Sequence, residues 1–402
     1  MPLFFRGRAA AAALAVGAAA LGAPVTFNNL ALMLDASGAI LDAHDQSMRR
    51  FSPTGPYYRH AVAYGGCLEP AGQGCERTAE NCGFQQNHSI NVWRSADLSS
   101  GSWVLASVAL SPAQRPPGVV FRPSAIYNAN TGTVVLGWNP MSDGLMTAVS
   151  ASGDPEGPFA YTGSSLNLTT GGVSDWAWFT DPAEPGAGYV IYSANFQIHI
   201  ERLTDDYLAV RGGGNFNFTF SEYFVEAPFL FVRNGLYYAL FGWCCCFCKQ
   251  GSNIMVHTAP HPLGPWTVQP TGPAYERGDV SCVPKNASSG AAAGAASAFE
   301  AAATAATAPA ALRVGTDPTP GLGCEYKNAS ETSTTRAQQN SVWLVDTPGG
   351  VEFLWVGDRW QQAPDGVKGH DPQTVLRLSF DDANGGQVRF VDWVDSFELD
   401  VI

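Results

Sequence analysis

Three charged residues recur at nearly equal intervals along the chain. Arg122, Asp175 and Glu226 each precede an apolar, aromatic-rich run, and their separations are 175 − 122 = 53 and 226 − 175 = 51 residues. Two carboxyl groups that face each other across a cavity can act as a general acid and a general base, the apparatus for hydrolysing glycosidic bonds. A single acidic residue at the start of a strand more often caps a turn. The shared spacing is what makes these residues candidates for catalysis.

A repeated pattern of short strands accounts for this spacing. The chain has 43 glycines and 27 prolines, which divide β-branched and aromatic runs into short segments without helical periodicity. Trp103, Phe159 and Trp266 close similar turns at separations of 159 − 103 = 56 and 266 − 159 = 107 residues, and segment 203–208 marks the unit between the last two. A period in the fifties with about four strands is typical of a β-propeller blade. The sequence predicts an all-β fold, a five-bladed β-propeller over residues 24–402.

The equivalent positions of the two remaining blades also carry polar residues. The innermost strand of every propeller blade borders the central channel, so residues at the starts of these strands should line one cavity. Blade one offers Asp42, His44 and Asp45 at this position, and blade five offers Gln338 and Gln339. We therefore expect one site to be built from all five blades.

The N-terminal segment is typical of a secretory signal. Residues 1–8 contain two arginines, and residues 9–23 form an alanine-rich apolar run shorter than the roughly 20 residues that span a bilayer. We expect residues 1–23 to be removed and the protein to be secreted, without attachment to a membrane. Five Asn-x-Ser/Thr sequons fit that route, at Asn87, Asn167, Asn217, Asn286 and Asn328.

Nine cysteines in an exported chain indicate disulfides, and the odd number leaves at least one without an intrachain partner. Cys67, Cys75 and Cys82 share one loop. A bond between Cys282 and Cys324 would close off the alanine-rich stretch 287–312, which we predict to be a mobile surface insertion without chemistry. The cysteine cluster at 244–248 lacks the second ligand pair of a zinc site, so disulfides are the favoured interpretation.

The charge balance excludes one class of partner. The chain has 22 basic and 35 acidic residues, a net charge of 22 − 35 = −13, and loss of Arg6 and Arg8 with the signal would give 20 − 35 = −15. A polyanion such as a nucleic acid would be repelled. We expect a monomer whose partner is a polysaccharide or oligosaccharide.

Over nearly all of residues 24–402 the sequence resembles glycoside hydrolase family 43, the five-bladed propeller glycosidases. The matching motifs are Ile-Leu-Asp-Ala-His-Asp at 40–45, Phe-Arg-Pro at 121–123, Val-Ser-Asp at 173–175, Glu-Ala-Pro at 226–228 and Gly-Asp-Arg-Trp at 357–360. The branch it most resembles is subfamily 24, which includes exo-β-1,3-galactanases. The resemblance implies that Glu226 is the general acid and that Asp175 tunes the pKa of the acid and orients it.

The resemblance leaves two candidates for the general base. Most of the family uses an Asp at the start of blade one, here Asp45 with Asp42 behind it. The galactanase branch has glycines at the neighbouring positions and is thought to route the proton through a blade-five glutamine, here Gln339. A glutamine side chain does not titrate and could only position water or use an imidic-acid form, so we rank Asp45 first and keep Gln339 as the alternative.

Several residues could contribute to substrate binding. Arg122 could bind sugar hydroxyls or keep Asp175 ionised, and a structural ion pair between blades is the alternative. Trp178, Trp243 and Trp360 could stack on sugar rings, although propellers also use such aromatics as packing between blades. Trp243, at the end of a strand beside the cysteine cluster, is the first choice. His44 is expected near the channel.

No residue pattern indicates a bound metal, and no cofactor is expected to be required. Some relatives hold a central calcium ion near a histidine, which leaves a structural calcium open by resemblance only.

Three functions remain open at the level of sequence. The first is an inverting exo-glycosidase acting on β-1,3-linked galactan or a similar polysaccharide. The second is an arabinofuranosidase or xylosidase of the same family. The third is a catalytically inactive carbohydrate-binding propeller.

Overall fold

The computed structural model describes residues 24–69, 82–141, 144–213, 215–221, 225–243, 249, 251–269, 282–284, 324–326, 335–389 and 391–402. These residues form 25 β-strands and a few short 3₁₀ turns, with no α-helix among them. None of the described segments is a helix long and apolar enough for a transmembrane span. The predicted signal segment 1–23, the alanine-rich stretch 287–312 and the cysteine cluster 244–248 lie outside the described residues.

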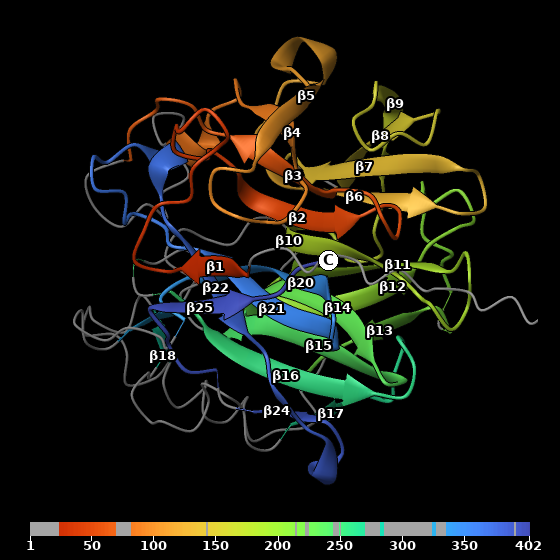
Figure 1. Ribbon diagram of the computed structural model, residues 1–402. Helices are drawn as coiled ribbons and strands as arrows, with labels where there is room; N and C mark the ends of the chain where they lie inside the picture. Colours follow the sequence, from red (N-terminus) through yellow and green to blue (C-terminus); the bar gives the residue numbers. More distant parts are fainter. Residues whose placement is uncertain are drawn as a thin grey trace, which may run out of the picture.

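Five antiparallel sheets surround a central channel, so the predicted five-bladed β-propeller is confirmed (Figure 1). Blade one contains β2 (His44–Arg50), β3 (Tyr57–Ala63), β4 (Ser89–Ser95) and β5 (Val104–Leu110). Blade two contains β6 (Phe121–Asn128), β7 (Thr133–Asn139), β8 (Leu145–Ser150) and β9 (Ala160–Leu166). Blade three contains β10 (Val173–Thr180), β11 (Gly188–Ala194), β12 (Gln197–Arg202) and β13 (Asn217–Thr219).

Blade four contains β14 (Val225–Arg233), β15 (Leu236–Trp243), β16 (Asn253–Ala259) and β17 (Thr267–Val268). Blade five has three strands, β20 (Gln338–Thr347), β21 (Gly350–Asp358) and β22 (Gln373–Arg377). In Figure 1 the first strands of the blades, β2, β6, β10, β14 and β20, gather at the middle of the molecule. The candidate site residues were predicted at the starts of these five strands.

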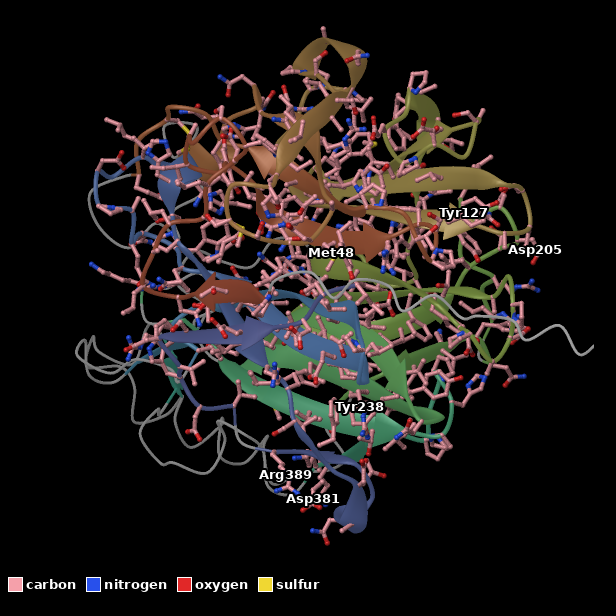
Figure 2. The ribbon with its side chains drawn as sticks, viewed as in Figure 1. Met48, Tyr127, Asp205, Tyr238, Asp381 and Arg389 are labelled. Carbon is pink, nitrogen blue, oxygen red and sulfur yellow. A yellow bond between two sulfur atoms is a disulfide. The ribbon has the colours of Figure 1, made fainter. Side chains whose placement is uncertain are left out.

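Neighbouring blades pack face to face, which explains the dense apolar runs of the sequence. All seven residues of β11 are buried, because blades cover both faces of this strand, whereas the outer strand β5 begins exposed. Trp176 of blade three packs directly on Gly137 of blade two, where a Cβ atom would lie 2.6 Å from the indole. Side chains fill the space between the sheets throughout (Figure 2). Glycine is therefore required at 137 to let the two blades approach.

The ring closes between blade five and blade one. The guanidinium of Arg59 in β3 is sandwiched between Trp103 and Trp343, at 3.9 and 4.5 Å from their ring centroids, and Arg59 Nη1 donates to Gln373 of β22 at 2.9 Å. Strand β1 (Val25–Asn28) pairs with β25 (Ser396–Leu399) near the two ends of the described chain. The contacts of Arg59 with Trp343 and Gln373 and the pairing of β1 with β25 join segments more than 200 residues apart.

The remaining elements are two small strand pairs and one disulfide. Strands β23 (Phe380–Asp381) and β24 (Gln387–Val388) form one hairpin, and β18 (Cys282–Pro284) pairs with β19 (Cys324–Tyr326). The second pairing brings the backbones flanking stretch 287–312 together, with Cys282 opposite Tyr326 and Cys324 opposite Pro284. Cys67 and Cys82 are disulfide-bonded. Of the predicted sequons, Asn87, Asn167 and Asn217 are described and exposed.

Candidate active site

The five innermost strands share a distortion at the point where each begins. In every blade the pairing of the first strand with the second shifts register there, between 44 and 47, 121 and 124, 173 and 176, 226 and 229, and 339 and 341. Asp45, Arg122 and Ala227 lie inside these irregularities with positive φ angles of 50°, 48° and 58°. A β-bulge bends its strand and re-aims side chains. The repeated bulge therefore turns the candidate residues out of the regular sheet pattern at one end of the channel.

Arg122 links three blades at this end of the channel. Its Nε donates a 2.8 Å hydrogen bond to Asp175 Oδ1, and its Nη2 and Nη1 donate to the backbone carbonyls of Gln339 and Asn340 at 2.6 and 3.2 Å. Burial alone would lower the pKa of Arg122, but the carboxylates of Asp175 and Asp45 raise it. The guanidinium is therefore a permanent positive charge among the acidic residues.

The contacts of Arg122 bear on the two roles predicted for it. Only 4% of its side chain is exposed, and all three of its nitrogens donate to the protein. These bonds use three of the five guanidinium N–H groups, so binding of sugar hydroxyls stays a prediction. The alternative, an ion pair with Asp175 that joins blade two to blade three, is the observed arrangement.

Asp45 is buried beside this charge. It lines a small cavity in the channel together with Arg122, Ser124, Ala177 and Phe229. Burial raises the pKa of Asp45 to about 6, and the nearby carboxylates of Asp358 and Asp175 add to this effect, while Arg122 opposes it. A carboxyl with a pKa close to neutrality is suited to accept a proton during a reaction.

Glu226 and Asp175 occupy the equivalent positions of blades four and three. Glu226 is partly exposed at the start of β14, beside Ala227. Asp175 is also partly exposed, and its second oxygen accepts a 3.0 Å hydrogen bond from Gln338 Nε2. Asp175 thus accepts hydrogen bonds from two donors, one of them the guanidinium of Arg122.

The two adjacent glutamines of blade five have different surroundings. Gln339 is fully buried: its amide nitrogen donates to the carbonyls of Ala227 and Leu240 at 2.7 and 2.9 Å, and its oxygen accepts from the Trp355 indole at 2.8 Å. Both amide hydrogens and the oxygen are thus committed to blade packing. This geometry favours Asp45 over Gln339 as the base.

Two of the three tryptophans that were candidates for sugar stacking are buried in the structure. Trp178 is completely buried and its indole donates to the carbonyl of Ser124, and Trp360 is 1% exposed and donates to Gln338 Oε1 at 2.6 Å. Neither ring has a face open to a ligand, because both side chains are buried. Of the two roles considered for Trp178 and Trp360, packing is the one observed. The side chain of Trp243 lies outside what the structure describes.

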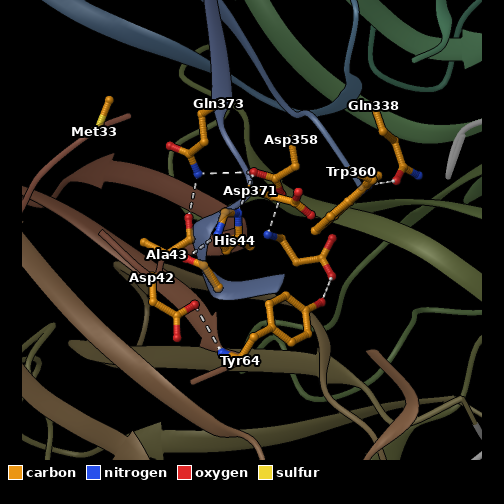
Figure 3. A network of polar contacts seen from close by, with 12 residues as sticks. Met33, Asp42, Ala43, His44, Tyr64, Gln338, Asp358, Trp360, Asp371 and Gln373 are labelled. Carbon is orange, nitrogen blue, oxygen red and sulfur yellow. Dashed lines mark hydrogen bonds and ion pairs between the residues drawn. The ribbon is translucent and has the colours of Figure 1, made fainter. Parts of the chain in front are cut away.

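His44 is also a structural residue. It is fully buried, with Nδ1 3.2 Å from Asp358 Oδ1 and Nε2 3.1 Å from the carbonyl of Gly369 (Figure 3). Burial alone would lower the pKa of His44, but the charges of Asp358, Asp42 and Asp371 raise it to about 9. Both partners are acceptors, which fits an imidazolium donating from both nitrogens. The prediction that His44 binds substrate is corrected accordingly.

His44 itself has no ligand atom to offer a calcium ion. Both of its ring nitrogens are occupied, and the cationic groups of Arg122 and Lys368 act on the neighbouring Asp45. Calcium takes six to eight oxygen ligands rather than cationic neighbours. Elsewhere in the described chain, Cys67, Cys82 and His88 have metal-ligand spacing, but the two cysteines are bonded to each other.

Sequence reasoning missed Tyr64 and Lys368 of this site, and it named Asp358 only as part of a motif and Gln338 only by its position. Asp358 accepts the backbone N–H of Asp45 at 2.7 Å, and Tyr64 donates to Asp45 Oδ2 at 3.0 Å (Figure 3). Gln338 and Lys368 act on Asp175 and Asp45 as described above. One signal was available for Tyr64: strand β3 must run antiparallel to β2, which brings the end of β3 next to His44.

Comparison with known proteins finds similar folds among solved structures. No family model and no curated protein matches the chain. Among solved structures, an exo-β-1,3-galactanase from Clostridium thermocellum matches with a TM-score of 0.61 at 20% identity, over 93% of this chain and 67% of that one. A GH43 β-1,3-galactosidase with galactodeoxynojirimycin matches at 0.60 and 19%, over 92% and 99%.

An exo-β-1,3-galactanase from Phanerochaete chrysosporium with galactose matches at 0.60 and 17%, over 94% of this chain and 69% of that one. An endo-1,4-β-xylanase from Bacteroides thetaiotaomicron matches at 0.52 and 15%, over 90% and 97%. The chain is a five-bladed β-propeller with the fold of glycoside hydrolase family 43 β-1,3-galactosidases.

Proposed function

We propose that this protein is a secreted, inverting exo-glycosidase that hydrolyses β-1,3-linked galactan or a closely similar polysaccharide. The observation that carries the proposal is the placement of three carboxyl groups, from blades one, three and four, at one end of the channel. Asp45 and Asp175 share the charge of Arg122 there, and Glu226 begins the next blade's inner strand.

The roles follow from the surroundings of each carboxyl. Glu226, partly exposed, donates its proton to the glycosidic oxygen as the bond from the anomeric carbon to that oxygen breaks. A water molecule attacks the anomeric carbon from the opposite face and gives its proton to Asp45. Asp175, held between Arg122 and Gln338, is the residue that orients Glu226. The sugar leaves with inverted configuration, and Asp45 returns its proton to solvent.

The substrate and the exo mode of action are supported by likeness. Three of the similar structures named above are described as exo-β-1,3-galactanases or a β-1,3-galactosidase, and two of them are described with galactose or galactodeoxynojirimycin. The proposed secretion is supported by the signal-like residues 1–23 and fits the Cys67–Cys82 disulfide.

The direct test is the hydrolysis of β-1,3-galactan by purified protein and by the variant Glu226→Gln. The wild type should release galactose, first as the α-anomer in proton NMR spectra recorded within minutes, and the variant should lose nearly all turnover while melting at the same temperature. Glu156→Gln, which changes a surface carboxylate of the Arg94 ion pair, is the matched control and should keep full activity. Full activity of Glu226→Gln would refute the assignment.

The substrate alternatives are separated by a panel of nitrophenyl glycosides. Faster release of nitrophenol from the β-galactoside than from the other substrates supports the proposal. Faster release from the arabinofuranoside or the β-xyloside would mean that the enzyme acts on that sugar instead, by the same mechanism. Binding of galactan without turnover of any substrate would establish the inactive, carbohydrate-binding alternative.

A further inference from the structure

Asp45 is held by two groups, one at its backbone and one at its carboxylate. Asp358 Oδ2 accepts the backbone N–H of Asp45 at 2.7 Å, which supports the positive φ of that residue, and Tyr64 Oη donates to Asp45 Oδ2 at 3.0 Å. One contact fixes the backbone and the other fixes one carboxylate oxygen. A base that takes a proton from water must point one oxygen at that water, so a hydrogen bond to the other oxygen sets its direction.

Tyr64 is in turn tightly held. It is 3% exposed, and its backbone N–H donates to Asp42 Oδ1 at 3.1 Å. Lys368 Nζ lies 4.8 Å from the centroid of the Tyr64 ring and 3.9 Å from that of Trp360, whose ring meets Tyr64 edge to face. The Lys368 ammonium also pairs with Glu69 at 2.9 Å, in a buried environment. These contacts join blade one to the segment after β21 and leave the phenol one position.

The charges around Asp45 agree with a donor role for the phenol. Arg122 and Lys368 act on Asp45 as cations, and Asp358 and Asp175 act as anions. Burial, Asp45 and Asp358 raise the pKa of Tyr64 well above its ordinary value. Tyr64 therefore stays protonated throughout the working range and can only donate to an ionised Asp45.

We propose that Tyr64 is a positioning residue for the base Asp45, and that Lys368 and Trp360 hold Tyr64 in that position. The inference rests on the proposed function for the role of Asp45 as base. The Tyr64 hydrogen bond stabilises the ionised carboxylate and leaves the other oxygen free to take the proton of the attacking water.

The test is a titration of the Asp45 carboxyl in Tyr64→Phe, observed by carbon NMR in protein labelled at aspartate and assigned by the signal lost in Asp45→Asn. Loss of a hydrogen bond to a charged group should raise the pKa of Asp45 by about one to two units. The acidic limb of kcat/KM should move to higher pH by the same amount. Lys368→Met, which removes a cation that acts on Asp45, should shift the titration in the same direction.

Tyr192→Phe is the matched control, because Tyr192 is buried and donates to Glu201 at 2.6 Å in another blade. It should leave the Asp45 titration unchanged. An unshifted Asp45 signal in folded Tyr64→Phe would overturn the inference, even if Glu226-dependent hydrolysis is observed. A shifted signal in a protein without hydrolytic activity would uphold the contact and refute the proposed function instead.

Discussion

Arg122 and Asp175 form an ion pair between blades two and three, with a distance of 2.8 Å from Nε to Oδ1. Both residues sit at bulged strand starts, 53 positions apart in the chain. The pair couples the architecture to the chemistry, because the guanidinium that joins the blades also supplies the positive charge next to Asp45.

Replacing Arg122 with methionine should therefore damage both stability and activity. Removing one partner of a buried ion pair leaves the other charge uncompensated and typically costs about 3–5 kcal/mol in unfolding free energy. Urea denaturation at pH 7 measures this loss. Arg94→Met is the control: its pair with Glu156 is largely exposed, so the change should stay below about 1 kcal/mol. Equal losses in the two variants would contradict the buried pairing.

Asp45→Asn should abolish turnover and stabilise the fold at pH 7. Because the pKa of Asp45 is raised from 3.8 to about 6, the folded state binds more protons than the unfolded state between these values, and its contribution to stability falls as the pH rises through that window. A neutral amide avoids this cost, on the order of 3 kcal/mol at pH 7. Denaturation at pH 4 and pH 7 should show a gain for the variant only at pH 7.

Activity should follow the same ionisation. The base must be charged, so kcat/KM should decline as the pH falls below about 6, the pKa of Asp45. A pH profile of hydrolysis that stays flat down to pH 4.5 would show that another group accepts the proton.

The two glutamines of blade five should respond differently to alanine. Gln339→Ala leaves the carbonyls of Ala227 and Leu240 and the indole of Trp355 without their partner, each worth about 1–3 kcal/mol when buried, so the main loss should be in stability. Gln338→Ala removes a donor to Asp175. This variant should therefore lose mainly kcat/KM, and its melting temperature should change little. A Gln339→Ala enzyme that stays fully folded at 15 °C but has no turnover would instead support Gln339 as the base.

The sequence could predict the blades but not the direction of every side chain. Period and strand count follow from local residue patterns, and polar residues before apolar runs indicated where the inner strands begin. Adjacent strand residues point to opposite sides, so a shift of one position separates Gln338, which contacts Asp175, from Gln339, which donates to the carbonyls of Ala227 and Leu240. Bulges decide that shift, and no local pattern indicated them. For the same reason Trp178 could not be assigned to packing or to a ligand.

Contacts between blade five and blade one, where the ring closes, were even harder to predict from the sequence. Lys368 reaches Tyr64 only because Leu68 pairs with Val367 and the N–H of Lys368 donates to the carbonyl of Cys67 at 3.0 Å. These partners are about 300 residues apart, and nothing in their local sequence encodes the meeting. Such contacts depend on the closure of the whole ring.

The buried His44–Asp358 pair should make stability depend on pH above neutrality. Because the pKa of His44 rises from 6.5 to about 9 on folding, its stabilising contribution is complete below pH 6.5 and is lost as the pH rises through 9, a change of roughly 3 kcal/mol. Urea denaturation at pH 6.5 and 9.5 should show this decline in the wild type and not in His44→Asn. His60→Asn is the matched control, since burial lowers the pKa of His60 to about 4 and this histidine is neutral across the same range. The decline should persist in that variant, and its persistence in His44→Asn as well would assign the titration to another group.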